Sequence, residues 1–186
     1  FLGYQLALGI YLGNALSDYI YEIVICNQVI ILGSVLIYCL IKRINIRETF
    51  RFNNPGLVPL LIITLLALPA TLAAGMFNTI VVYLLQFIGE VPSAGIPVPQ
   101  NLKELLVGIL IIGVLPGICE EMLHRGLLLR AYEKRGSYKA VVFVAILFGM
   151  FHFDITNLFG PILLGLIIGY YVIRTNSIFA GIYAHF

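Results

Sequence analysis

Residues 119–130 read CEEMLHRGLLLR, and this stretch closes a long apolar run. The run has the length and composition of a membrane helix. It nevertheless carries two adjacent carboxylates, Glu120 and Glu121, and one turn later His124 and Arg125. An ionisable side chain at the centre of a bilayer costs about 3 kcal/mol by insertion scales. A cluster of such groups inside a membrane helix therefore predicts a functional site with partners on neighbouring helices.

The overall composition is that of a membrane protein. Of the 186 residues, 61% are hydrophobic and 11% are charged, whereas about 25% are charged in soluble domains. Several apolar runs reach about 18 residues, the length that crosses a bilayer. The fold class we predict is all-α, a polytopic bundle of membrane helices. The net charge of +2 does not favour nucleic-acid binding, and the spacing of the three cysteines favours neither disulfides nor a metal site.

Seven spans are visible in the apolar pattern, and we expect an eighth to follow. The predicted spans are 1–17, 23–41, 57–88, 102–130, 140–155, 157–173 and the residues from 178 onward. The third is too long for one straight span, and it contains Pro69 and Gly75, so we expect a tilted or kinked helix. We interpret the chain as one integral membrane domain, in which N-terminal helices (1–101) precede a core (102–186) that carries the ionisable cluster.

The distribution of Lys and Arg predicts the topology. Basic residues are concentrated in two loops, 42–54 and 130–139, and Arg174 follows a later span. Cytoplasmic loops are enriched in Lys and Arg, so both loops are predicted to be cytoplasmic. A chain this short, without soluble additions, suggests a multi-pass protein of a bacterial cytoplasmic membrane.

Three separate helices place polar side chains at a similar depth. Counted from the nearest basic loop at about 1.5 Å per residue, Glu120 lies roughly 21 Å deep, His152 roughly 20 Å and His185 roughly 17 Å. This coincidence predicts one polar cavity, sunk into the membrane and open to the cytoplasm.

The local spacing suggests a division of roles between the two carboxylates. Glu121 and Arg125 form an i, i+4 pair with the acid first, which is the favourable order, so Glu120 is left free. A free buried carboxylate can take a proton from water, a histidine can hold the same water, and a second imidazole can donate to an oxyanion. These are the parts needed to hydrolyse a peptide bond without a covalent nucleophile.

Three short motifs carry a resemblance to a known family. Residues 120–125 match EExxxR, residues 148–152 match FxxxH, and His185 lies where HxxxN would begin. In this order on successive apolar helices, they resemble the CPBP family of intramembrane proteases. These are the CAAX-protease and bacteriocin-processing (ABI) proteins, which include type II CAAX prenyl endopeptidases. The resemblance covers about 102–186, and the asparagine of the third motif would fall three residues after Phe186.

The resemblance implies a role for each matching residue. Glu120 would be the general base that activates water, and His152 would help to bind that water. His185 would supply part of the oxyanion hole. The family resembles a glutamate-type protease more than a zinc enzyme, so we expect no cofactor.

The remaining matching positions would support the site. Glu121 and Arg125 would form a supporting pair, and Phe148 would pack beside the site and contact the substrate. The implied partners are the lipid bilayer and a membrane-associated peptide or protein, either CAAX-like or another precursor.

The residues also allow other interpretations. Glu120, His152 and His185 could be zinc ligands with an open fourth position. The same groups could be the proton relay of a transporter, although the ionisable cluster belongs to one half only and no internal repeat is visible. A membrane immunity or scaffold protein without catalytic activity is a further alternative.

Overall fold

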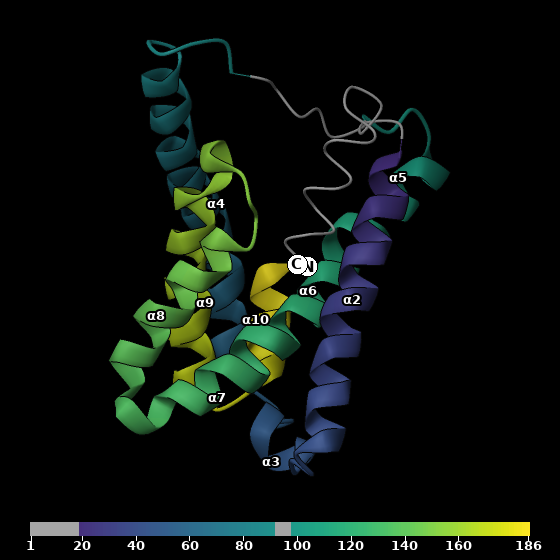
Figure 1. Cartoon of the computed structure of the whole chain (residues 1–186), viewed down its shortest axis with the longest axis vertical. Helices are drawn as coiled ribbons and strands as arrows, with labels where there is room; N and C mark the ends of the chain where they lie inside the picture. Colours follow the sequence, from purple (N-terminus) through teal and green to yellow (C-terminus); the bar gives the residue numbers. More distant parts are fainter. Residues whose placement is uncertain (1–18, 92–97) are drawn as a thin grey trace.

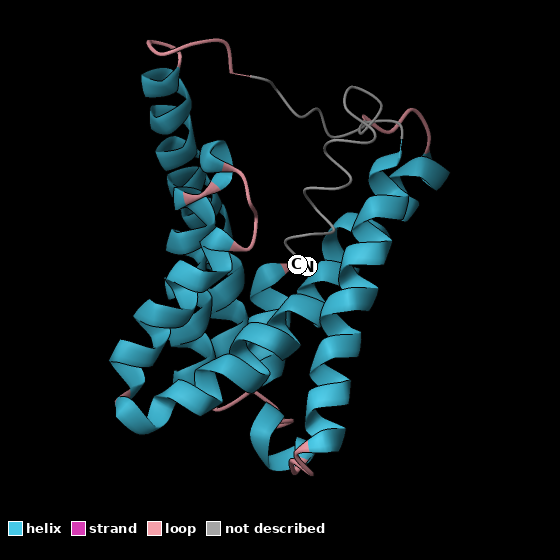
Figure 2. Ribbon diagram, viewed as in Figure 1, coloured by secondary structure: helices cyan, strands magenta, loops and turns pink. Residues whose placement is uncertain are grey.

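The computed structural model describes residues 19–91 and 98–186, and these form helices and loops without a strand (Figure 2). The all-α class is therefore confirmed for this part of the chain. The predicted span over 1–17 lies outside the described residues. Among the described residues, four helical segments are long and apolar enough to cross a membrane: Ile20–Ile41, Leu57–Leu85, Leu102–Arg135 and Ile155–Thr175. The count of seven spans remains a prediction.

The helix that carries the two carboxylates is longer and less regular than predicted. It continues to Arg135 instead of ending near Arg130. Two π-helical segments, η2 and η3, interrupt it on either side of α6. Its successive parts are α5 (Leu102–Gly108), η2 (Ile109–Val114), α6 (Leu115–Glu121), η3 (Met122–Leu128), α7 (Leu129–Tyr132) and the 3₁₀ turn η4 (Glu133–Arg135).

This long helix connects two groups of helices (Figure 1). Its first half packs against α2 (Ile20–Ile41), and its end packs against α8 (Ser137–Met150). In the second group, α9 (Phe159–Thr175) packs against α8 and against α4 (Leu57–Leu85). The short helix α10 (Ile178–His185) contacts α4, α6 and α9. The helices α6 and α10 therefore lie where the two groups of helices meet.

The helix predicted over 140–155 ends five residues early, at Met150. Phe153 adopts a left-handed conformation with φ of 51°, which an α-helix cannot include. The carboxylate of Asp154 then accepts a hydrogen bond from the backbone N–H of Thr156 at 2.8 Å and begins the 3₁₀ turn η5 (Ile155–Asn157). His152 therefore lies just after α8, in a chain reversal.

The two basic loops meet at one end of the bundle. Arg51, which follows the short helix α3 (Ile46–Phe50), is buried and forms an ion pair with the partly buried Glu133. Glu133 also binds Arg130, with an Nη1 to Oε2 distance of 3.2 Å. Burial lowers the pKa of Arg51 from its ordinary value, and the facing Glu133 carboxylate opposes that change. The shared network is consistent with the prediction that both loops lie on the same side of the membrane.

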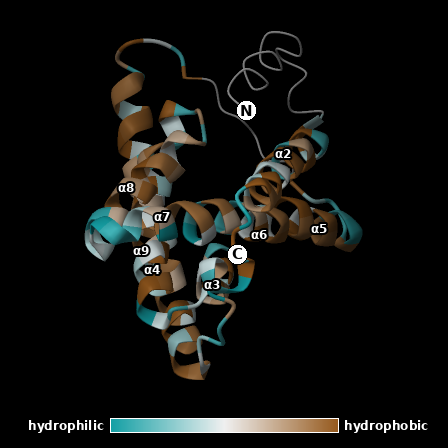
Figure 3. Cartoon of the chain, turned by 60° about the horizontal axis from the view of Figure 1, so that its bottom comes forward, coloured by the Kyte–Doolittle hydropathy of each residue, from teal (hydrophilic) through white to brown (hydrophobic). Residues whose placement is uncertain are grey.

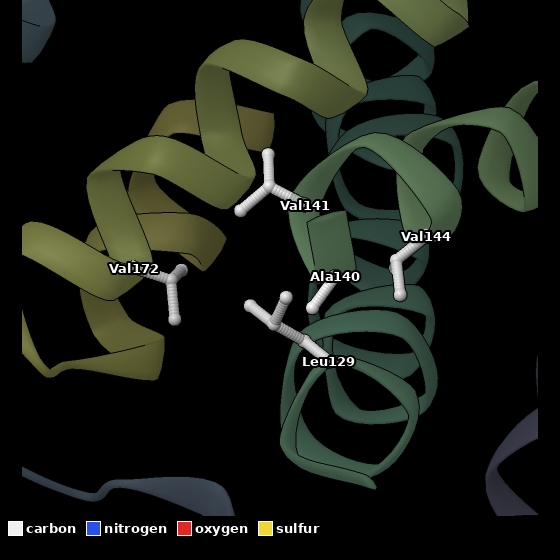
Figure 4. Packing of buried hydrophobic residues seen from close by; sticks show 5 residues of the cluster. All are labelled: Leu129, Ala140, Val141, Val144 and Val172. Carbon is white, nitrogen blue, oxygen red and sulfur yellow. The ribbon is translucent and has the colours of Figure 1, made fainter. Parts of the chain in front are cut away.

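Aliphatic side chains form one buried cluster of the interior, whereas many large apolar side chains face outward. One buried cluster joins the long helix to α8 and α9 through Leu129, Ala140, Val141, Val144 and Val172 (Figure 4). By contrast, only Ile63 and Ala74 are buried in the 29 residues of α4. The outer helix surfaces are hydrophobic, and hydrophilic residues gather at helix ends and loops (Figure 3). A helix that is apolar all round is suited to lipid.

Candidate active site

Helix irregularity surrounds the two carboxylates. The segment α6, which contains both, lies between the π-helical segments Ile109–Val114 and Met122–Leu128. Pro116 lies at the start of α6 and has no N–H to donate to the preceding turn. Single π turns inside α-helices occur frequently at functional sites. Only Pro116 signals this irregularity in the sequence, so the π segments were missed.

The structure brings Glu120, His152 and His185 together around one cavity of about 290 Å³. They come from the long helix, from the reversal after α8 and from the end of α10. The other residues that line the cavity are Val24, Asn27, Gln28, Ile31, Ile112, Pro116, His124 and Phe151. Three of the four from α2, namely Val24, Asn27 and Gln28, lie in the half of that helix farther from Lys42. Three histidines and one carboxylate therefore share a single polar space within an apolar bundle.

The Glu120 carboxylate is half-buried and is held from a distant helix. Its Oε1 accepts a hydrogen bond of 2.9 Å from the side-chain amide of Gln28 in α2. Gln28 itself is 4% exposed. Because this bond occupies one carboxylate oxygen, it fixes the orientation of the other one.

Glu121 has a different environment, although it is the next residue. Its side chain is fully buried, and its Oε1 accepts hydrogen bonds from Arg125 Nη1 at 2.6 Å and from His185 Nδ1 at 2.9 Å. Arg125 also donates to the backbone carbonyl of Gly165 at 3.3 Å. A β-carbon at Gly181 would lie only 2.7 Å from Glu121 Oε2, so the close approach requires glycine. Successive residues of a helix face different directions, which separates the two carboxylates.

The Phe148 ring lies at the centre of the charged and imidazole groups. The Arg125 guanidinium lies over this ring, 4.6 Å from its centroid, in a cation–π geometry. The rings of His124, His152 and His185 meet it edge-on at centroid distances of 5.0, 5.2 and 5.6 Å. Phe148 therefore fixes the planes of three imidazoles and one guanidinium at once.

The hydrogen bonds of the imidazoles determine which nitrogen is free. His124 Nδ1 lies 2.9 Å from the carbonyl oxygen of Glu120, and His152 Nδ1 lies 2.9 Å from that of Phe148. A carbonyl oxygen only accepts, so each Nδ1 must donate. In the neutral ring, Nε2 of each is then an acceptor. His185 likewise donates from Nδ1 to the carboxylate of Glu121, which is already paired with an arginine.

Three polar residues of the cavity wall were not assigned a role from the sequence. Gln28 and Asn27 lie in α2, outside the motifs, and His124 lies inside EExxxR at an unspecified position. An Asn-Gln pair within a predicted membrane span is a signal that could have identified the first two, because polar residues in spans are costly. Within 19–91 and 98–186, no three His, Cys, Asp or Glu side chains are arranged to hold a metal ion.

The fold and the cavity together define a helical integral membrane protein with a buried carboxylate–imidazole site. Residues 102–186 match the family model described as Type II CAAX prenyl endopeptidase Rce1-like. This match agrees with the resemblance that the motifs suggested. No curated protein and no solved structure matches the chain.

Proposed function

We propose that the protein is an intramembrane endopeptidase that hydrolyses a peptide bond of a membrane-associated substrate with water activated by Glu120. The main support is that Glu120, His152 and His185 line one polar cavity in an apolar bundle. The match to a CAAX-protease family supports peptide hydrolysis as the reaction. The carboxylate as general base and the nature of the substrate are our own proposals.

In the proposed first step, a water molecule donates one hydrogen bond to the Glu120 carboxylate and a second hydrogen bond to His152 Nε2. Both acceptors are free for this, because Glu120 uses one oxygen for Gln28 and His152 uses Nδ1 for a backbone carbonyl. Glu120 removes the proton while the water oxygen attacks the carbonyl carbon of the substrate. A C–O bond forms, and the carbonyl electron pair moves onto oxygen.

In the second step the oxyanion collapses. The C–N bond breaks, and the leaving nitrogen receives the proton that Glu120 took from water, so that the base is regenerated. The products are a carboxylic acid and an amine. No covalent enzyme intermediate is needed.

His185 is proposed to stabilise the oxyanion from Nε2. Because its Nδ1 donates to Glu121, the ring can donate from Nε2 only when both nitrogens carry protons. The Glu121 carboxylate accepts a hydrogen bond from this ring and orients it, while Arg125 holds Glu121 in place. The Glu121–Arg125 pair would thus act through His185.

We propose a membrane-anchored peptide, prenylated or otherwise lipid-attached, as the substrate. The large apolar side chains that face outward are suited to a lipid bilayer, from which such a peptide would approach. Access from the cytoplasmic side of a bacterial membrane is proposed from the two basic loops, which the Arg51–Glu133 ion pair holds at one end of the bundle.

The test is cleavage of quenched peptides, prenylated and unprenylated, by the purified full-length protein. Wild type would be compared with Glu120→Gln and His152→Ala, with and without a chelator. The matched control is Lys139→Gln, at an exposed position far from the cavity. We expect wild type and the control to cleave the peptide with chelator present. In both site variants we expect the rate of cleavage to fall at least 100-fold. Undiminished cleavage by Glu120→Gln would show that the proposed base is wrong.

A further inference from the structure

Two adjacent amides of α2 line the cavity, and each carries a buried acceptor atom without a partner among the described residues. Asn27 and Gln28 both line it. The Gln28 NH2 group donates to Glu120, so its own Oε1 is the atom that remains. Gln28 Oε1 and Asn27 Oδ1 are buried and have no hydrogen-bond partner among the described residues. Buried polar atoms without a partner are rare in folded proteins, which indicates that a ligand or solvent donor reaches these two.

A third atom of the cavity has the same character. His124 is 1% exposed, and its Nε2 has no partner in the described part of the chain. Since its Nδ1 donates to the Glu120 carbonyl oxygen, Nε2 of the neutral ring is an acceptor. All the buried and unpartnered atoms that line this cavity are therefore acceptors. The cavity is complementary to a ligand that carries N–H or O–H donors, which a hydrocarbon chain lacks and a peptide backbone has.

We propose that Asn27 and Gln28 form a subsite for the peptide backbone, in which their side-chain oxygens accept hydrogen bonds from main-chain N–H groups of the substrate. This rests on the proposed function and adds to it the path of the substrate, which lies between α2 and α6 beside Glu120. Gln28 has two roles, because its NH2 group positions Glu120 while its oxygen binds the peptide. Contacts to the main chain do not depend on the substrate's side chains.

The geometry of an extended peptide gives the proposal a specific signature. Successive residues of an extended chain face opposite sides, so N–H groups of residues i and i+2 point the same way, about 6.6 Å apart. Two acceptors from neighbouring helix positions would therefore engage two N–H groups that are two residues apart. The N–H between them would face away from α2.

The experiment uses a farnesylated peptide that ends in the C-a-a-X pattern and a series of analogues, each with one backbone amide replaced by an ester. An ester removes one N–H and keeps the length of the chain. Binding to full-length protein in detergent is measured by fluorescence anisotropy on ice, and cleavage is measured separately at working temperature. For wild type we expect two sensitive positions, two residues apart, at which the ester weakens binding about fivefold to tenfold.

The variants assign these positions to the amides. In Asn27→Leu, the ester at one of the two positions should change the binding affinity by less than about twofold relative to the amide peptide. In Gln28→Met, the same should hold for the ester at the other position. Asn27→Ser, which keeps an oxygen acceptor, should retain sensitivity. Gln28→Met should also lower kcat, because Glu120 loses its donor, whereas Asn27→Leu should mainly raise KM. The control is Val29→Leu, a neighbour that is 65% exposed and outside the cavity, which should behave as wild type.

The outcomes separate this proposal from the proposed function. Identical ester sensitivity in wild type, Asn27→Leu and Gln28→Met would overturn the subsite, as would a wild type that binds no peptide. Cleavage that depends on Glu120 but shows no such pattern of ester sensitivity would support the endopeptidase and contradict the subsite. The expected pattern of ester sensitivity in binding, without cleavage of any peptide, would support the subsite and contradict the endopeptidase. A thermal unfolding curve for each variant shows that it is folded.

Discussion

Gln28 and Glu120 lie 92 positions apart in the sequence, and their side chains share a hydrogen bond of 2.9 Å in the cavity wall. This bond connects α2, which lies outside the segment that matches the protease family, to the carboxylate that we propose as the base. The orientation of Glu120 therefore depends on the packing of α2 against α6.

The buried pair of Glu121 and Arg125 should respond to charge removal in a characteristic way. Replacing Arg125 by Met leaves a fully buried carboxylate without its cation, which we expect to destabilise the protein by about 3–5 kcal/mol. The double variant Glu121→Gln, Arg125→Met removes both charges and should be more stable than the single variant. Thermal unfolding in detergent measures this difference. Equal stability of the single and double variants would show that the pair is not coupled.

The close approach of Gly181 to Glu121 predicts an effect of a single methyl group. In Gly181→Ala, the new β-carbon would lie 2.7 Å from Glu121 Oε2 and 2.8 Å from Val172 Cγ2. We expect a loss of stability of about 1–3 kcal/mol and a displaced Glu121, with reduced peptide cleavage. Gly33→Ala is the matched control, because no atom lies within 4 Å of its β-carbon and alanine favours a helix. The two variants are compared by unfolding temperature and activity, and equal results would contradict the packing.

The proposed role of His185 predicts that a neutral donor can partly replace it. His185→Ala removes the donor, and we expect kcat to fall about 100-fold to 1,000-fold with little change in KM. His185→Gln retains an N–H donor of similar reach and should keep a larger fraction of kcat. Single-turnover cleavage by the two variants and wild type measures this. A Gln variant as inactive as the Ala variant would favour a role as proton carrier instead of simple donor.

The predicted topology can be tested by labelling single cysteines. The native cysteines 26, 39 and 119 are first replaced by Ser or Ala. A cysteine at the exposed Arg47 should react with a membrane-impermeant thiol reagent only in inside-out vesicles, because its loop is predicted to be cytoplasmic. A cysteine at the exposed Val98 should react in intact cells. The reverse pattern would place the basic end outside.

The sequence could predict the helical class because membrane spans are long apolar segments with a definite length. It could also bring Glu120, His152 and His185 to one depth, since an α-helix rises by a constant amount per residue. The early end of α8 was missed, because the left-handed Phe153 depends on a turn and not on apolar content. The π segments were missed because hydropathy is the same in α- and π-helices. Gln28 was missed because its relation to Glu120 arises from the tertiary packing of α2.

Gln28 also has a consequence for comparing related genes. A paralogue could retain EExxxR and FxxxH unchanged and still carry an apolar residue at the position of Gln28. Such a copy would match the same family model, because the matched segment begins at residue 102. Its carboxylate would nevertheless lack the amide that orients it. To distinguish active copies from inactive ones, the sequence of α2 would then have to be compared as well, although the motifs do not include this helix.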